Sequence, residues 1–84
     1  MYEVYLEAAA ERDLKRLTSE IFHRIIENIN VLRMNPRPHG SRKIKTSKND
    51  WRIRVGSYRI IYEVDDQSRA VKILRIRYRR EAYR

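Results

Sequence analysis

The sequence contains no cysteine, only two histidines and no long apolar run. Without cysteine, neither a disulfide framework nor a thiolate zinc site can form. Without a long apolar run or a signal-like amino terminus, the chain is expected to be a soluble cytoplasmic protein with no membrane partner. No spacing of His, Asp or Glu is typical of a metal site, so neither a metal nor another cofactor is expected.

Positive charge is the most pronounced feature of the composition. The chain has 20 Lys and Arg against 11 Asp and Glu, which gives a net charge of +9 and an isoelectric point near 10.4. This balance favours nucleic acid, an acidic surface or an acidic protein as the partner. With 84 residues and no internal repeat or linker, the chain is expected to form one small domain over residues 1–84 with a modest core.

Residues 51–64 predict two antiparallel strands joined by a two-residue turn, Gly56-Ser57. Glycine at the first turn position is typical of a type II′ turn, which sets the register of the two strands. Because side chains alternate along a strand, one face is predicted to join the core: Trp51, Ile53, Val55, Tyr58, Ile60 and Tyr62. The opposite face, called the arginine face below, carries Arg52, Arg54, Arg59, Ile61 and Glu63.

In this register Arg54 lies directly across from Arg59, with Arg52 two residues away on the same face. Like charges in opposed positions destabilise a sheet by roughly 0.2–1 kcal/mol. An anionic partner would convert this repulsion into binding energy, and arginine is the side chain best matched to phosphate. The arginine face is therefore predicted to be an open polyanion site, although a merely solvated charged face is the alternative.

The remaining segments predict a strand at 2–6, amphipathic helices at 8–17 and from 19 onward, a loop at 36–40 and a short strand at 43–46. After a turn at 65–68, strict alternation in a last strand at 70–77 divides its side chains between two sides. Leu74 and Ile76 are predicted to join the core, which would put Arg75 and Arg77 on the arginine face, together with Val71 and Ile73. The fold class is therefore α+β in two layers, with an N-terminal strand and a helical hairpin packed on a mainly antiparallel sheet.

Residues 51–64 (WRIRVGSYRIIYEV) and 75–83 (RIRYRREAY) resemble the core and tail of the RelE/ParE superfamily of type II toxins. The similarity extends over the whole chain, including the NPRP break at 35–38, and favours the RelE branch. It implies a microbial-ribonuclease-like fold and ribosome-dependent endoribonuclease activity on mRNA, without a metal. The alternatives are a ParE-like inhibitor of DNA gyrase and an inactive module that only binds nucleic acid or an antitoxin.

The resemblance also implies site residues and partners. The catalytic set is Arg54, Arg59, Arg77, for which Arg79 is an alternative, and Tyr83. RNA binding is predicted for neighbouring basic side chains: Arg52, Arg75, Arg79, Arg80, Lys43 and Lys45. The expected partners are a cognate antitoxin that lays an acidic or amphipathic segment over the basic face, mRNA on the ribosome and ribosomal RNA.

The chemistry of RNA cleavage divides these side chains into two roles. Arginines can stabilise charge on the phosphoryl oxygens, but a guanidinium is a poor base because its pKa lies above about 12. Tyr83 is the predicted acid or base, since nearby arginines would lower its pKa. His23 is predicted to be a helix-surface residue and His39 a solvated loop residue, both away from the arginine face. Trp51, Tyr58 and Tyr62 could stack on bases, but their pattern favours the core.

Overall fold

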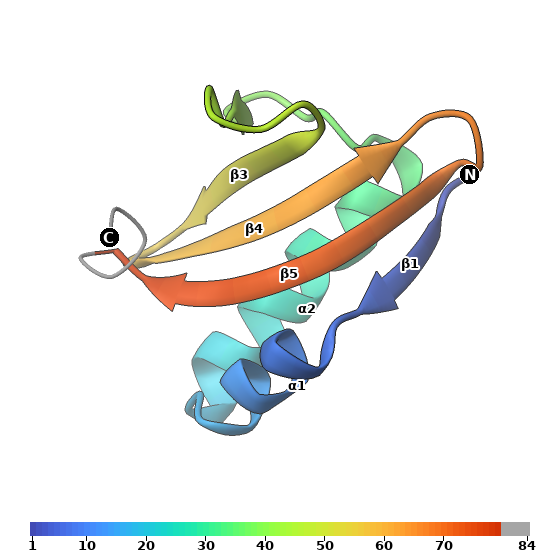
Figure 1. Ribbon diagram of the computed structural model, residues 1–84. Helices are drawn as coiled ribbons and strands as arrows, with labels where there is room; N and C mark the ends of the chain where they lie inside the picture. Colours follow the sequence, from blue (N-terminus) through green and yellow to red (C-terminus); the bar gives the residue numbers. More distant parts are fainter. Residues whose placement is uncertain (80–84) are drawn as a thin grey trace.

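The computed structural model describes residues 1–79, in which two helices pack on a five-stranded sheet (Figure 1). The elements are β1 (Glu3–Leu6), α1 (Ala8–Lys15), α2 (Ser19–Met34), β2 (Arg42–Lys43), β3 (Asp50–Val55), β4 (Tyr58–Asp65) and β5 (Ala70–Tyr78). The strand order is β1-β5-β4-β3-β2, with β1 parallel to β5 and the other neighbours antiparallel. The predicted two-layer α+β class is confirmed.

The β3–β4 hairpin has the predicted register, in which Val55 pairs with Tyr58, Arg54 with Arg59 and Ile53 with Ile60. Gly56 has a φ of 59°, a value that an L-residue with a side chain rarely adopts. A Cβ atom added at Gly56 would also lie 3.2 Å from an Nη atom of Arg24 on α2. The turn therefore requires glycine for its backbone conformation, whereas the exposed Arg24 side chain can move away from an added Cβ.

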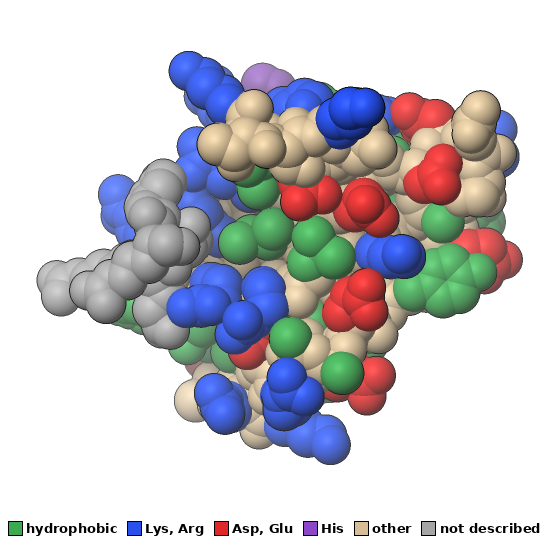
Figure 2. All heavy atoms as spheres, viewed as in Figure 1, with side chains coloured by type: hydrophobic (Ala, Val, Ile, Leu, Met, Phe, Trp, Pro, Cys, Tyr) green, Lys and Arg blue, Asp and Glu red, His purple; other side chains and the backbone are tan. Residues whose placement is uncertain are grey.

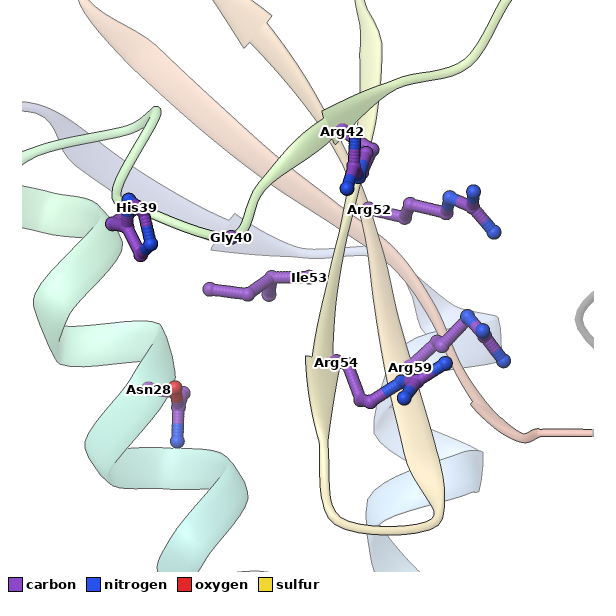
Figure 3. Close-up of a pocket in the computed structure, with 8 residues that line it drawn as sticks. All are labelled: Asn28, His39, Gly40, Arg42, Arg52, Ile53, Arg54 and Arg59. Carbon is purple, nitrogen blue, oxygen red and sulfur yellow. The ribbon is translucent and has the colours of Figure 1, made fainter.

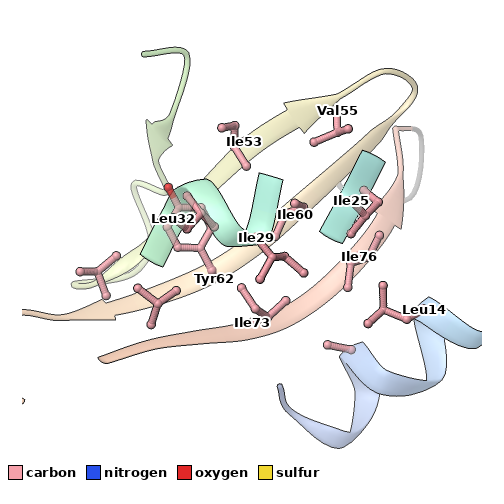
Figure 4. Close-up of a cluster of buried hydrophobic side chains, with 13 residues drawn as sticks. Leu14, Ile25, Ile29, Leu32, Ile53, Val55, Ile60, Tyr62, Ile73 and Ile76 are labelled. Atoms are coloured by element: carbon pink, nitrogen blue, oxygen red, sulfur yellow. The ribbon is translucent and has the colours of Figure 1, made fainter. Parts of the chain in front are cut away.

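The core lies between α2 and one face of the sheet (Figure 4). The predicted apolar stripe of α2 supplies Ile25, Ile29 and Leu32, which contact the predicted core face of the hairpin. The Tyr62 hydroxyl, buried at the centre of the sheet, donates a hydrogen bond of 2.7 Å to the Pro36 carbonyl oxygen. Burial raises the pKa of Tyr62 to about 12, which keeps the phenol protonated as a donor.

Strand β5 departs from the predicted alternation. Tyr62 pairs with Ile73 while the adjacent Ile61 pairs with Arg75, so Leu74 is an extra residue in β5. This is a β-bulge, and it reverses which side of the strand faces the core. Val71, Ile73 and Ile76 are therefore all buried. The expectation that Val71 and Ile73 share a face with Arg75 and Arg77 was wrong, because a strict two-residue period does not anticipate a bulge.

Two other boundaries differ from the sequence-based expectations. Helix α1 ends at Lys15 and not at residue 17, and β2 covers only Arg42–Lys43, because the chain leaves the sheet before it returns as β3. Helix α2 crosses behind the sheet, whereas α1 lies beside β5, beyond the end of β1 (Figure 1). Within residues 1–79, neither helix has the length and apolar character that a membrane span requires.

Candidate functional site

Three arginines form a row across neighbouring strands of the arginine face. Arg54 of β3 pairs with Arg59 of β4, and Arg59 pairs in turn with Arg77 of β5. A second row continues the basic surface, because Arg52 pairs with Arg42 of β2 on one side and with Ile61 on the other, next to Arg75. Adjacent strands lie about 4.8 Å apart, so the rows concentrate positive charge within a small area.

Arg59 is more enclosed than the sequence predicted. Its exposed fraction is 4%, whereas Arg54, directly across from it, is exposed. An Nη1 atom of Arg59 donates a hydrogen bond of 3.4 Å to the backbone carbonyl oxygen of Arg79. The expectation of an open face is therefore wrong at Arg59, where the carbonyl of Arg79, the residue directly after β5, contacts the guanidinium. Arg59 combines a structural contact with its place in the arginine row.

A hollow of about 490 Å³ lies at the edge of β3 (Figure 3). It forms because β2 pairs only with Trp51 and Arg52, so the rest of β3 has no strand on that side among the described residues. Its volume is within the range of roughly 300–1,000 Å³ that is common for small-molecule sites. The lining residues are Asn28, His39, Gly40, Arg42, Arg52, Ile53, Arg54 and Arg59.

The lining includes residues that sequence reasoning did not place there. Figure 3 shows Asn28 and His39 on the α2 side of β3, while Arg52 and Arg59 extend on its other side. His39, expected to lie away from the arginine face, lines the same hollow as Arg52 and Arg59 but lies across β3 from them. The position of Arg42 could have been foreseen from its pairing with Arg52, but no sequence signal identifies Asn28.

The loop that carries His39 is held at several points. The Pro36 carbonyl accepts the hydrogen bond from buried Tyr62. Arg37 donates two hydrogen bonds to Asp66, of 2.8 and 3.2 Å, and its guanidinium lies 5.1 Å from the centre of the Trp51 ring. The hydrogen bond from Arg37 lowers the pKa of Asp66, so this carboxylate stays ionised. The loop is thereby fixed to β4, β3 and the β4–β5 turn.

The remaining predicted site residues that the structure describes do not line the hollow at β3. Arg75 and Arg77 lie on the arginine face but line a second hollow beside α1, not the first. Arg79 donates its backbone N–H to the Ser57 carbonyl at 2.7 Å and is exposed. Lys43 donates to the Ser47 carbonyl at 2.6 Å, and neither it nor Lys45 lines the hollow at β3. Arg80 and Tyr83 lie outside the described residues.

Asp13 of α1 holds the bulged part of β5. It is 8% exposed and accepts hydrogen bonds from Arg75 Nε at 2.8 Å, Arg75 Nη2 at 3.2 Å and the Ile76 N–H at 2.9 Å. Burial by itself raises the pKa of Asp13, but the hydrogen bonds from Arg75 and Ile76 outweigh it, and the net pKa is lowered. Asp13 therefore occupies the edge of β5 where β1 has ended, and it orients Arg75.

The substitution Asp13→Asn is expected to destabilise the fold by about 1–3 kcal/mol at neutral pH, because it removes the charged acceptor of the buried Ile76 N–H and of Arg75. Since the folded pKa is lowered from the usual value of 3.8, the charge stabilises the fold above that value and ceases to do so as pH falls through the folded pKa. Urea unfolding from about pH 7 to pH 3 should show the difference between wild type and variant shrinking only below about pH 4. Glu11→Gln, an exposed change on the same helix, is the control and should have little effect at neutral pH.

The charge on the uncovered face of the sheet is unevenly distributed. Figure 2, seen from the same side as Figure 1, shows Lys and Arg side chains concentrated toward the C-terminal end of β5, with Asp and Glu more frequent on the other half. The second half includes Glu63, which lies 3.8 Å from Lys72. The basic half contains the arginine row and can bind an anion, because guanidinium groups present paired donors to phosphate oxygens.

Known proteins show the same sequence pattern and fold. The family profile described as "ParE toxin of type II toxin-antitoxin system, parDE" matches residues 4–83. Toxin RelE of Mycobacterium tuberculosis is 36% identical over 88 residues, covering 99% of this chain and 87% of the relative. Toxin RelG of the same organism is 31% identical over 84 residues, covering 99% and 97%.

A solved toxin structure has the same fold as this chain. The toxin chain in the archaeal RelE–RelB complex of Pyrococcus horikoshii superimposes with a TM-score of 0.83 at 26% identity, covering 93% of this chain and 94% of the other. The sequence profile, the relatives and the fold agree over nearly the whole length of the chain. This chain therefore belongs to the RelE/ParE superfamily of toxins of type II toxin–antitoxin systems, with RelE-like toxins among its relatives.

Proposed function

We propose that this toxin is a ribosome-dependent endoribonuclease that cleaves mRNA without a metal and so inhibits translation. The observation that carries the proposal is the row of Arg54, Arg59 and Arg77 beside a hollow large enough for part of an RNA strand. Like charges aligned across three strands weaken the sheet, and a phosphate bound there relieves the repulsion. RelE-type relatives with similar sequences support this class of activity.

In the proposed reaction, the 2′-hydroxyl oxygen of one nucleotide attacks the adjacent phosphorus, and the bond to the 5′ oxygen of the next nucleotide breaks. The proton of the 2′-hydroxyl passes to a base, and the leaving 5′ oxygen receives a proton. Negative charge grows on the phosphoryl oxygens during this step. Arg54 and Arg59 supply fixed positive charge for those oxygens, with Arg77 next in the row, and such preorganised groups need no rearrangement as the charge develops.

Proton transfer requires a different side chain, because an arginine does not give up its proton at neutral pH. Tyr83 remains the candidate that the family resemblance implies. Among the described lining residues, His39 has a side chain of the kind most often used as a general acid or base. We assign most of the rate enhancement that these side chains do not supply to orientation of the mRNA by the ribosome. Correct placement of the reacting groups alone can supply a large part of a rate enhancement.

The proposed partners follow from charge and from the relatives. The Pyrococcus horikoshii toxin was solved as a RelE–RelB complex. We assign this chain a cognate antitoxin with an acidic or amphipathic segment that covers the basic half of the sheet, because a net charge of +9 attracts an acidic chain. In the free state the toxin binds mRNA and ribosomal RNA in the cytoplasm.

One observation favours a second function. The matching family profile is named for ParE toxins, and the rival proposal from the sequence is inhibition of DNA gyrase. In that case the arginine face binds protein or DNA and catalyses no cleavage. An inactive module that only binds its antitoxin or nucleic acid is the remaining alternative, and induction of the chain separates all three.

Expression of this chain without an antitoxin is expected to stop translation within minutes, while DNA supercoiling stays unchanged. Primer extension on a reporter mRNA should show new 5′ ends at ribosome-occupied codons, and these ends should vanish when the start codon of the reporter is removed. Early DNA damage with intact mRNA would instead support the gyrase inhibitor. Unimpaired growth with accumulated folded protein would support the inactive module.

A further inference from the structure

A second hollow, of about 150 Å³, lies on the opposite edge of the sheet, between α1 and the last part of β5. It exists because β1 pairs with β5 only as far as Ile73, so the following part of β5 borders α1 in place of a strand. The lining residues are Asp13, Arg16, Leu17, Tyr58, Arg75, Ile76, Arg77 and Tyr78. Arg75 and Arg77 belong to the predicted RNA-binding and catalytic sets, whereas Arg16 and Tyr78 had no predicted role.

The hollow is positively charged. Three arginines line it against a single aspartate, Asp13, which is already engaged by Arg75 and the Ile76 N–H. Arg77 also lies close enough to Asp13 to lower the pKa of this carboxylate, and the exposed Arg16 adds a further positive charge. Arg77 is also the last member of the row that begins at Arg54 in the first hollow. The arginine row thus runs across three strands from one hollow to the other, with Arg59 nearly buried at its middle.

The hollow also contains an aromatic surface. Tyr58 and Tyr78 lie on neighbouring strands with their ring centres 5.3 Å apart and their planes at 88°. This edge-to-face contact holds the Tyr78 ring in a defined orientation, although 45% of the residue is exposed. Exposed aromatic rings beside basic groups are the usual means by which proteins bind single-stranded nucleic acid, because bases stack on the rings while phosphates contact the cations.

We propose that this second hollow binds one unpaired nucleotide of RNA, with the base against Tyr78 and the phosphate at Arg16 and Arg77. The proposal rests on the proposed function, because it extends the RNA beyond the cleavage position along the arginine row. About 150 Å³ is equivalent to roughly five water molecules in the liquid, which suits a single base and excludes a helix or a duplex. Because Tyr78 pairs with Tyr58 of the core face, the substrate would cross the strands on the arginine face and then turn over the edge of β5 to reach Tyr78.

The test measures binding of a short single-stranded RNA whose 2′-hydroxyls are all methylated, so that cleavage cannot occur. Fluorescence anisotropy with the full chain should show about tenfold weaker binding for Tyr78→Ala, the loss expected for one base stacked on an aromatic ring. Arg16→Ala should bind several-fold more weakly, with a salt dependence reduced by about one counterion. Arg16 is exposed, so its substitution also serves if Tyr78→Ala fails to fold.

Two matched controls lie on the same molecule. Arg12→Ala removes an exposed arginine from the same helix, and Tyr5→Ala removes a tyrosine that is 54% exposed on β1. Neither residue lines the second hollow, so both controls should bind the RNA within about twofold of wild type. Equal losses in controls and test variants would overturn the proposal in favour of diffuse electrostatic attraction.

Two further results would also decide the matter. If Tyr78→Ala and Arg16→Ala bind RNA normally but bind an acidic antitoxin peptide more weakly, the hollow is a protein-docking site and the proposal is wrong. Cleavage of mRNA on ribosomes by the wild type is scored separately. If the wild type cleaves mRNA and both variants bind RNA normally, only the proposal for the second hollow is overturned. If the wild type does not cleave but the variants show the expected losses of RNA binding, only the proposed function is overturned.

Discussion

Substitution of Arg54 by alanine is expected to reduce ribosome-dependent mRNA cleavage by about a hundredfold or more, the usual cost of removing a group that stabilises a developing negative charge. The fold should be as stable as wild type or more stable by up to about 1 kcal/mol, because the change removes one of two opposed arginines. Arg54 is exposed and directly across from Arg59. Thermal melts and a cleavage assay on the same preparation measure both effects.

Arg33→Ala is the matched control for this change, because Arg33 is an exposed arginine in the last turn of α2 and is absent from the lining of the first hollow. It removes the same charge and should leave cleavage near the wild-type level. If Arg54→Ala cleaves normally while melting several degrees lower, Arg54 is a structural residue. The arginine row would then have no part in catalysis.

Arg59→Ala is expected to lose activity by a similar factor but also to lose stability, by about 1 kcal/mol. Relief of repulsion from Arg54 and Arg77 gains about 0.4–2 kcal/mol, at roughly 0.2–1 kcal/mol for each of the two opposed pairs. Against this, a charged donor to a carbonyl is worth about 1.5–3 kcal/mol, and Arg59 is nearly buried and donates to the Arg79 carbonyl. The loss therefore exceeds the gain, and urea unfolding should show it.

Arg59→Lys separates the two roles of this side chain. Lysine keeps the charge and the apolar stem but lacks the planar fork that pairs with two phosphate oxygens. We expect Arg59→Lys to recover most of the stability and to remain at least tenfold less active than wild type. Full recovery of cleavage in Arg59→Lys would mean that only the charge of Arg59 matters for activity. Wild-type stability of Arg59→Ala would show that Arg59 has no structural role.

The sequence alone determined the hairpin and the face on which its arginines lie. A two-residue turn that begins with glycine permits only one register of the two strands. Because side chains alternate with a period of two, this register assigns every residue of the hairpin to a face. For this reason the pairing of Arg54 with Arg59 and the burial of Ile60 and Tyr62 were predicted correctly. The apolar stripe of α2 could also be predicted from nearby residues alone, because its spacing reflects only the geometry of a helix.

Only the tertiary structure decided how these local elements form a site. The bulge at Leu74 depends on pairing between β4 and β5 and on the contact of Asp13 from α1 with Ile76. The nearly buried Arg59 donates a hydrogen bond to the carbonyl of Arg79, 20 residues along the chain. The two hollows form where β2 and β1 end short of their neighbouring strands. These features arise from contacts between residues far apart in sequence, which local periodicity does not encode, and they bring His39 and Tyr78 into hollows that arginines also line.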